Sequence, residues 1–199
     1  MQRADIHNEV CAASDRALTT LREARIAFYH QNGFSEDGGV TNQRWSPFAF
    51  RAIKPQLPNF KWRRRALPIH DLHHVIAGYE FSPCGEFEMS AWEFAAGPYP
   101  NAWSTLFCLP LVTIGVTIIP RRTFKAFVRG RRSKTLYDAS HVEALLDKSI
   151  AEVRRDCVPV EDVRASFRDV TAFAMLLSAS LIVTVSPALL ISALWFLGR

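Results

Sequence analysis

A long uncharged run near the C-terminus constrains this chain more than any other feature of its sequence. From Val170 to Gly198, 29 consecutive residues include no Asp, Glu, Lys, Arg or His. As a helix, such a run extends about 43 Å at 1.5 Å per residue, whereas one membrane span needs roughly 20 apolar residues. Two full spans do not fit, and Pro187 in the middle is tolerated within a membrane helix. We therefore predict a single C-terminal transmembrane helix over residues 169–198.

The rest of the chain has the composition of one folded domain. Removing the uncharged run from the 199 residues leaves roughly 165, enough for one domain with its own core. Aromatic residues make up 12% and charged residues 22% of the chain, a composition that excludes a disordered protein. The four cysteines form no C-x-x-C pair, which argues against a zinc knuckle or a dithiol redox site.

The local patterns predict an all-α fold. Apolar spacing predicts a helix over residues 13–30, capped by Ser14 or Asp15, and a short helix over 69–77. Residues 31–68 are irregular, with many Gly and Pro residues and no convincing strand. Ser82 caps a helix that opens at Pro83. We expect an N-terminal helix within residues 1–30 and a lipid-binding helical domain over 31–160.

One or two amphipathic helices are predicted over residues 138–157. Their apolar positions recur on one side. These positions are Val142, Leu145, Leu146, Ile150 and Val153.

A second uncharged run, over residues 102–119, has two interpretations. It is 18 residues long, broken by Pro110 and bounded by Pro120. We favour a helix pair that is buried or contacts the membrane within the domain, and a true crossing is the alternative.

Seven basic residues and no acid follow this run between Arg121 and Lys134, and account for much of the net charge of +5. The stripe is a solvated face or, beside an apolar segment, a patch for anionic lipid headgroups or an anionic substrate group. Arg129, Arg131 and Lys134 are the candidate lipid or headgroup contacts.

Charge also predicts the side of the membrane. The first 20 residues carry several charges and no apolar core of a signal peptide. Arg164 and Arg168 precede the uncharged run and only Arg199 follows it, which places the main domain on the cytoplasmic side by the positive-inside rule.

One cluster of side chains carries chemistry. In the string HDLHH, His70 and His74 are four residues apart, so on a helix both imidazoles project from one face and can bind one cation. Asp71 is adjacent, and Glu86 falls in the first turn of the next predicted helix, which a helical hairpin would return to the histidine pair. Two nitrogens and up to two carboxylates suit zinc or another divalent ion. The alternative is a pair of ordinary surface or capping histidines.

Other histidine enzymes fit poorly. The H-x-x-H-H pattern is that of membrane di-iron desaturases, but those need about eight histidine ligands and only three more histidines remain, each isolated. Neither E-x-x-H nor H-E-x-x-H occurs. We expect His73 to lie behind the ligands or on the surface, because it projects roughly 100° from His74. Glu80, Glu88 and Glu93 are expected to be solvated helix charges.

The same residues resemble a known family. His70, Asp71, His74 and Glu86 form H-D-x-x-H-x11-E, the signature of the coenzyme Q (ubiquinone) biosynthesis family whose eukaryotic member is the fourth Coq protein. Gly78 and the Gly85–Glu86 pair also match, and residues 127–160 resemble the family's closing stretch. The resemblance covers about residues 30–160. An aromatic residue usual near Ser140 or His141 is missing, and the C-terminal tail lies outside the pattern.

The resemblance implies an all-helical, membrane-associated domain that binds a polyprenyl tail in an apolar groove lined by residues 102–119. It implies a divalent metal, zinc in our reading, held by the four signature residues. The activity it implies is a metal-dependent step on a polyprenylated ring precursor, decarboxylation or hydroxylation at C1. The metal would act as a Lewis acid on the ring carboxylate or phenolate.

A different class of function stays open, a non-enzymatic polyprenyl-lipid-binding scaffold that organises other quinone biosynthesis proteins. In that case the metal would only hold two helices together. In both cases we expect a homo-oligomer at a membrane and no nucleic-acid partner.

Overall fold

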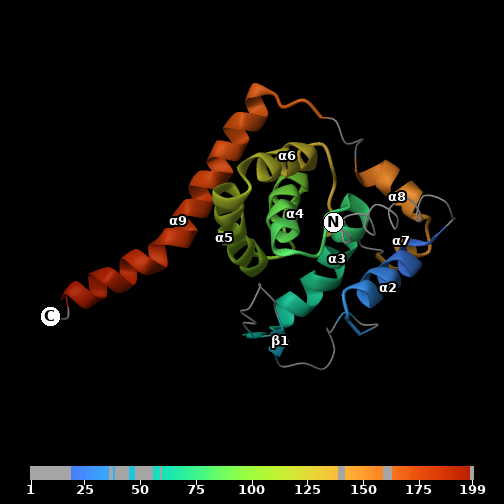
Figure 1. Cartoon of the computed structure of the whole chain (residues 1–199), viewed down its shortest axis with the longest axis horizontal. Coiled ribbons are helices and arrows are strands. Elements are labelled where there is room, and N and C mark those ends of the chain that lie inside the picture. Colours follow the sequence, from blue (N-terminus) through green and yellow to red (C-terminus); the bar gives the residue numbers. More distant parts are fainter. Residues whose placement is uncertain are drawn as a thin grey trace.

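The computed structural model describes residues 19–35, 38, 45–47, 56–58, 60–138, 142–158 and 163–197 (Figure 1). Its helices are α2 (Leu21–Gln31), α3 (Lys61–Ala77), α4 (Pro83–Ala96), α5 (Ala102–Ile118), α6 (Pro120–Gly130), α7 (Val142–Leu146), α8 (Ile150–Cys157) and α9 (Phe167–Leu197). Between α2 and α3, the three-residue strands β1 (Trp45–Pro47) and β2 (Gln56–Pro58) pair antiparallel, with Ser46 opposite Leu57. The predicted all-α class is confirmed, and this small ladder is the addition to it.

Helix α4 lies at the centre of the domain, with α3, α5 and α6 around it (Figure 1). Every residue from Gly85 to Glu93 is buried, so the helix is enclosed on all sides rather than on one stripe. Met89 and Trp92 have no exposed surface and pack with Phe127 of α6 and Ala77 of α3. Polar residues on α4 are therefore held inside the protein and must find partners there.

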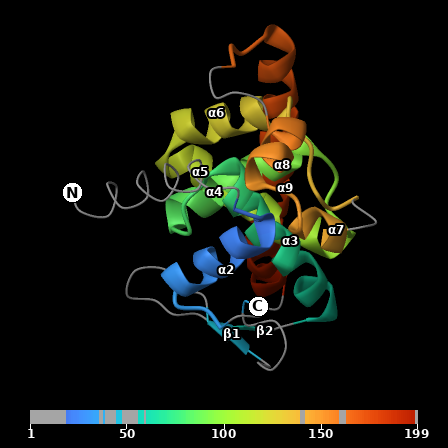
Figure 2. The ribbon, with the colours of Figure 1, turned by 90° about the vertical axis from the view of Figure 1, so that its right-hand side faces the viewer.

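A second apolar core joins α2, α3, α7 and α8. Helices α2, α7 and α8 lie on the right of Figure 1, with α3 between them and α4, and this side faces the viewer in Figure 2. The predicted apolar positions between 142 and 153 all contribute to it, as expected. Leu21 of α2 is fully buried in the same core. The N-terminal helix is thus packed into the main domain instead of standing apart from it.

One predicted helix start lies outside the described residues, and another differs from the structure. The described helix α2 begins at Leu21, where the Thr20 hydroxyl accepts the Glu23 amide and Glu23 reaches back to the Thr20 amide, a capping box. The predicted caps, Ser14 and Asp15, lie outside the described residues. Helix α3 begins at Lys61, eight residues before the predicted Ile69.

Two helices continue through a proline residue where the sequence predicted a later start or a break. Pro68 lies inside α3 and Pro110 inside α5, which is one continuous helix and not a broken pair. Each proline removes one intrahelical hydrogen bond. The first turn of α3 packs on α5, where Trp62 contacts Phe107 with ring centroids 5.9 Å apart. Tertiary contacts of this kind can offset a local helix penalty.

The turn between α3 and α4 follows its prediction. The Ser82 hydroxyl accepts the Gly85 amide at 3.1 Å, and Pro83 occupies the first turn. A Cβ on Gly85 would come within 1.9 Å of the Glu80 carbonyl oxygen, so only glycine fits where the chain folds back. The hairpin thereby brings the start of α4 beside the last turns of α3.

Helix α9 is the one helix in the described part of the chain that is long and apolar enough to cross a membrane. It runs for 31 residues through Pro187 and passes beside α5 before extending away from the domain (Figure 1). Ser180 of α9 bonds to Thr113 and to the Leu109 carbonyl of α5. Hydroxyl contacts of this kind join helices in membranes.

The first turn of α9 is fixed to the domain by charge. Asp169 and Ser166 hydrogen-bond each other's amides, closing a cap. The Asp169 carboxylate, 3% exposed, accepts from Arg132 at 2.9 Å and from Arg131 at 3.4 Å. These contacts fix the start of α9 to the residues that follow α6.

The crossing of α6 over α4 provides a test of the packing. A Cβ on Gly130 would lie 2.3 Å from the Trp92 carbonyl oxygen, which is backbone and cannot move aside alone. We predict that Gly130→Ala lowers the free energy of unfolding by about 1–3 kcal/mol, measured by denaturant titration in detergent. Lys125→Ala, an exposed change on the same helix, is the control and should have little effect. Equal stability of Gly130→Ala and the wild type would contradict this close approach.

Candidate metal centre

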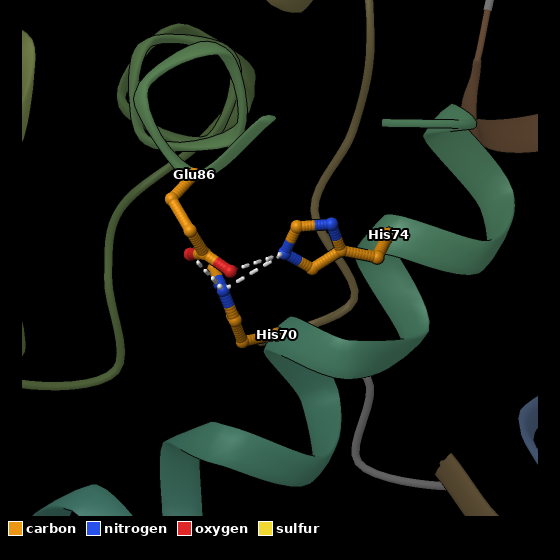
Figure 3. A group of neighbouring side chains, drawn as sticks. All are labelled: His70, His74 and Glu86. Atoms are coloured by element: carbon orange, nitrogen blue, oxygen red, sulfur yellow. Dashed lines mark hydrogen bonds and ion pairs between the residues drawn. The ribbon is translucent and has the colours of Figure 1, made fainter. Parts of the chain in front are cut away.

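Three side chains from α3 and α4 converge on one point (Figure 3). His70 and His74 project from the same face of α3, and Glu86 reaches them from the first turn of α4. Their ligand atoms lie within 4.8 Å of one another. His70 Nε2 is 3.2 Å from His74 Nε2 and 3.2 Å from Glu86 Oε2, while His74 Nε2 is 3.3 Å from Glu86 Oε1. The hairpin predicted from the sequence thus unites three of the four signature residues.

Hydrogen bonds on the far side of each ring fix which nitrogen faces the centre. His74 Nδ1 lies 3.0 Å from the Tyr79 carbonyl oxygen, which only accepts, so Nδ1 carries the proton. His70 Nδ1 lies 3.1 Å from both carboxylate oxygens of Glu93. Each Nε2 therefore presents its lone pair to the centre when the ring is neutral. Metal-binding histidines are held in this way by a carbonyl or a carboxylate.

A divalent cation fits this arrangement. Two facing Nε2 lone pairs and a carboxylate have no hydrogen to share unless a proton or a metal ion lies among them. Two histidines and one glutamate are a known ligand set for catalytic zinc, which keeps its fourth position open. His70, His74 and Glu86 can therefore hold a metal ion.

The electrostatics also favour positive charge at the centre. Burial would raise the pKa of Glu86, but the charges of His74 and His70 and their hydrogen bonds lower it below the usual range. Burial opposes charging of His70, yet Glu93 and Glu86 raise the pKa of His70 well above its usual value. Carboxylates on two sides thus stabilise a cation between them.

Glu93 is the central acceptor of the site, and the prediction that it is a solvated helix charge is wrong. It is 0% exposed. Besides His70, it accepts from His73 Nδ1 at 2.6 Å, from the Tyr99 hydroxyl at 2.9 Å and from the Tyr137 hydroxyl at 2.8 Å. Its spacing of seven residues from Glu86, two helical turns on one face, was the signal available in the sequence. Its tyrosine partners have no such signature.

His73 lies outside the ligand group, as predicted, but it is not on the surface. The side chain is fully buried beside Trp92. Nδ1 donates to Glu93, and Nε2 accepts the Leu136 amide at 2.8 Å. Burial lowers the pKa of His73. The residue ties the segment after α6 to the metal centre.

Asp71, predicted as a fourth ligand, is not part of the convergent group. It is buried and accepts a hydrogen bond of 3.1 Å from the Tyr29 hydroxyl of α2. Burial raises the pKa of Asp71 to about 6. The structure thus places this carboxylate between α2 and α3.

A cavity of about 100 Å³ adjoins the centre between α3, α4 and α5, with His70 and Glu86 in its wall. Most of its other lining is apolar or aromatic. Cys108 also lines it, outside the convergent group, and burial raises the pKa of that thiol to about 12. The remaining lining residues are Trp62, Arg63, Ala66, Leu67, Tyr99, Ser104, Phe107, Leu111 and Tyr137.

The basic stripe is partly used inside the fold. Arg129 donates to the Ala77 carbonyl at 2.6 Å and lies over the Tyr79 ring, so it joins α6 to the end of α3. Arg131 pairs with Asp169, whereas Lys134 is exposed.

The predictions for the two other glutamates have different outcomes. Glu88, predicted to be solvated, is buried and accepts hydrogen bonds from Arg122 through both carboxylate oxygens. Glu80 is exposed, as predicted.

No protein-family model matches the chain, and searches of curated proteins and of solved structures also find no match. The functional argument therefore starts from the structure, an all-α domain with a His–His–Glu group and one candidate membrane helix in the part of the chain that the structure describes.

Measuring the metal content of variants distinguishes the ligands His74 and Glu86 from the neighbouring Asp71. We predict that zinc co-purifies with the wild type at one ion per chain, and that His74→Ala and Glu86→Gln each lose it. Asp71→Asn should retain it, since asparagine still accepts from Tyr29. Native mass spectrometry with elemental analysis provides the measurement. Loss of the ion from Asp71→Asn with the helical content unchanged would instead make Asp71 a ligand.

Because Glu93 orients His70 without being a ligand, its substitution should weaken metal binding without abolishing it. Glu93→Gln keeps an oxygen acceptor but removes the charge behind His70, and should weaken zinc affinity about 10- to 100-fold. Competition with a fluorescent chelator measures this. Glu80→Gln, the same change at an exposed carboxylate between α3 and α4, is the control. Wild-type affinity in Glu93→Gln would show that the hydrogen bond to His70 Nδ1 does not tune the centre.

Proposed function

We propose that this protein is a membrane-anchored enzyme that carries out a metal-dependent step on the ring of a polyprenylated precursor in ubiquinone synthesis. The observation that carries the proposal is the pairing of a three-ligand His–His–Glu centre with an adjoining apolar cavity. The spacing of His70, Asp71, His74 and Glu86 supports the assignment to quinone synthesis.

The ligand number favours catalysis over a purely structural metal. Structural zinc sites are closed by four protein ligands, commonly with cysteine, whereas catalytic sites keep three and leave one position for water or substrate. Here three side chains converge, and two of them also line the cavity. When bound, the metal would polarise a ring carboxylate or phenolate oxygen and stabilise negative charge that develops on it.

The neighbouring side chains hold their protons and shape the cavity. The Tyr99 and Tyr137 hydroxyls both donate to Glu93, and burial followed by the nearby negative charges raises the pKa of each well above its usual value. Both tyrosines therefore remain protonated and are not bases. Trp62 and Phe107 offer aromatic faces on which a ring can stack.

The outer surface of α5 supports access from the lipid. Trp103 is 65% exposed, and Leu106, Phe107 and Ile118 are also exposed on this helix. Helix α5 packs against α9, the candidate span, and Phe107 also lines the cavity. A contiguous exposed apolar surface beside a membrane helix is best covered by lipid. A polyprenyl tail could then stay in the bilayer while the ring enters the cavity, with the domain on the cytoplasmic side.

Product formation tests the proposal. Purified protein in nanodiscs should convert a short-chain 3-polyprenyl-4-hydroxybenzoate to a product in which C1 carries a hydrogen or a hydroxyl group and the carboxylate has left as CO2. For the hydroxylated product, added dioxygen supplies the oxygen atom and an added reductant supplies two electrons, with water as the other product. Mass spectrometry distinguishes the two products. His74→Ala and Glu86→Gln should reduce the rate by about 100-fold or more, because the Lewis acid is lost. Glu80→Gln is the matched control.

Two results would contradict the proposal that this protein is an enzyme. Zinc-loaded wild type that binds the polyprenyl compound without turning it over would favour the lipid-binding scaffold. Loss of folding together with the metal in both variants would favour a structural ion.

A further inference from the structure

Arg63 is a cation in the cavity wall without a complete set of partners. It lies on α3 seven residues before His70, two turns away on the same face. Its Nη1 is shielded from solvent and has no hydrogen-bond partner among the described residues. Leaving a buried donor unpaired is costly, more so when it is charged. An arginine in this position therefore calls for an acceptor that enters the cavity.

The acids nearby do not satisfy Arg63. Asp71 and Glu86 lie close enough to act on its charge, but Asp71 accepts from Tyr29 and Glu86 faces the two histidines. Without Arg63, the buried carboxylates of Asp71, Glu86 and Glu93 would repel an anionic ligand. The guanidinium in the cavity wall is thus placed to offset that repulsion.

The cavity between the two polar ends suits one ring. Ala66, Leu67 and Leu111 form apolar walls, and the volume of about 100 Å³ is on the scale of cavities that hold a single benzene ring. Arg63 and His70 are about 10 Å apart along the helix axis. A planar guanidinium matches a planar carboxylate through two parallel hydrogen bonds.

We infer that Arg63 is a specificity-determining residue that binds the carboxylate of an aryl carboxylate ligand and directs the opposite edge of its ring toward His70 and Glu86. This inference rests on the proposed function for the identity of the ligand, and it deepens it by assigning the orientation of the ring. Arg63 selects the ligand and positions it without being a metal ligand.

Binding of matched compounds tests the inference on the full chain in detergent. The probes are 3-prenyl-4-hydroxybenzoate, 2-prenylphenol, which lacks the carboxylate, and prenyl phosphate. Isothermal titration on zinc-loaded and on chelated protein measures each affinity. We expect Arg63→Gln to weaken the carboxylate probe about 10- to 100-fold and to leave 2-prenylphenol unchanged. Arg63→Lys should recover part of the loss, and Arg65→Gln, an exposed change one half-turn on, should behave as wild type.

The outcomes separate this inference from the proposed function. If Arg63→Gln weakens the binding of both ring compounds equally, or of neither, the proposed role of Arg63 is wrong. If prenyl phosphate binds more tightly than the carboxylate probe and its binding depends on Arg63, the ligand is a phosphate and not an aryl carboxylate. Arg63-dependent binding of the carboxylate probe without turnover would contradict only the proposed enzymatic activity.

Discussion

The buried carboxylate of Glu93 is the interaction on which the domain interior depends. A charge with no exposed surface is stable only when its surroundings supply hydrogen bonds and positive charge. Glu93 receives them from two histidines of α3 and from two tyrosines that flank α5 and α6 in the sequence. These four contacts tie three separate stretches of chain to α4. Removing any one would leave the others around an undercompensated charge, so the site is coupled to the fold.

The candidate metal site of His70, His74 and Glu86 lies within this network and not on the surface. Glu93 holds His70 from behind, and the Tyr79 carbonyl does the same for His74. The hairpin turn that returns Glu86 to them depends on Ser82 and Gly85. Outside the polar interior, the exposed surfaces of α5 and α9 are apolar, which is the arrangement expected where a domain meets lipid. The cavity lies between the polar network and this apolar layer.

The sequence predicted those parts of the site that depend on local spacing. The i, i+4 histidines, the cap at Ser82 and the position of Glu86 follow from helical geometry over a few turns. Glu93 was misplaced because its burial comes from contacts far along the chain, such as that with Tyr137, 44 residues apart. Asp71 carries the signature spacing, yet Tyr29 of α2 binds it on another side.

The same limit explains the helices. Pro68 and Pro110 are local signals of a helix end, and packing between Trp62 and Phe107 overrides them. By contrast, α9 followed directly from the lack of charge in the sequence, because length and composition alone define a candidate span. Features set by neighbours in the chain were therefore predictable, and features set by neighbours in space were not.

X-ray absorption at the zinc edge of the purified protein tests the central claim most directly. The account predicts a first shell of two imidazole nitrogens and a carboxylate oxygen at about 2.0–2.1 Å, completed by a light-atom ligand, with no sulfur. Loss of one imidazole contribution in His74→Ala should follow if any zinc remains bound. A sulfur shell near 2.3 Å, or a spectrum without imidazole scattering, would contradict a centre built from His70, His74 and Glu86.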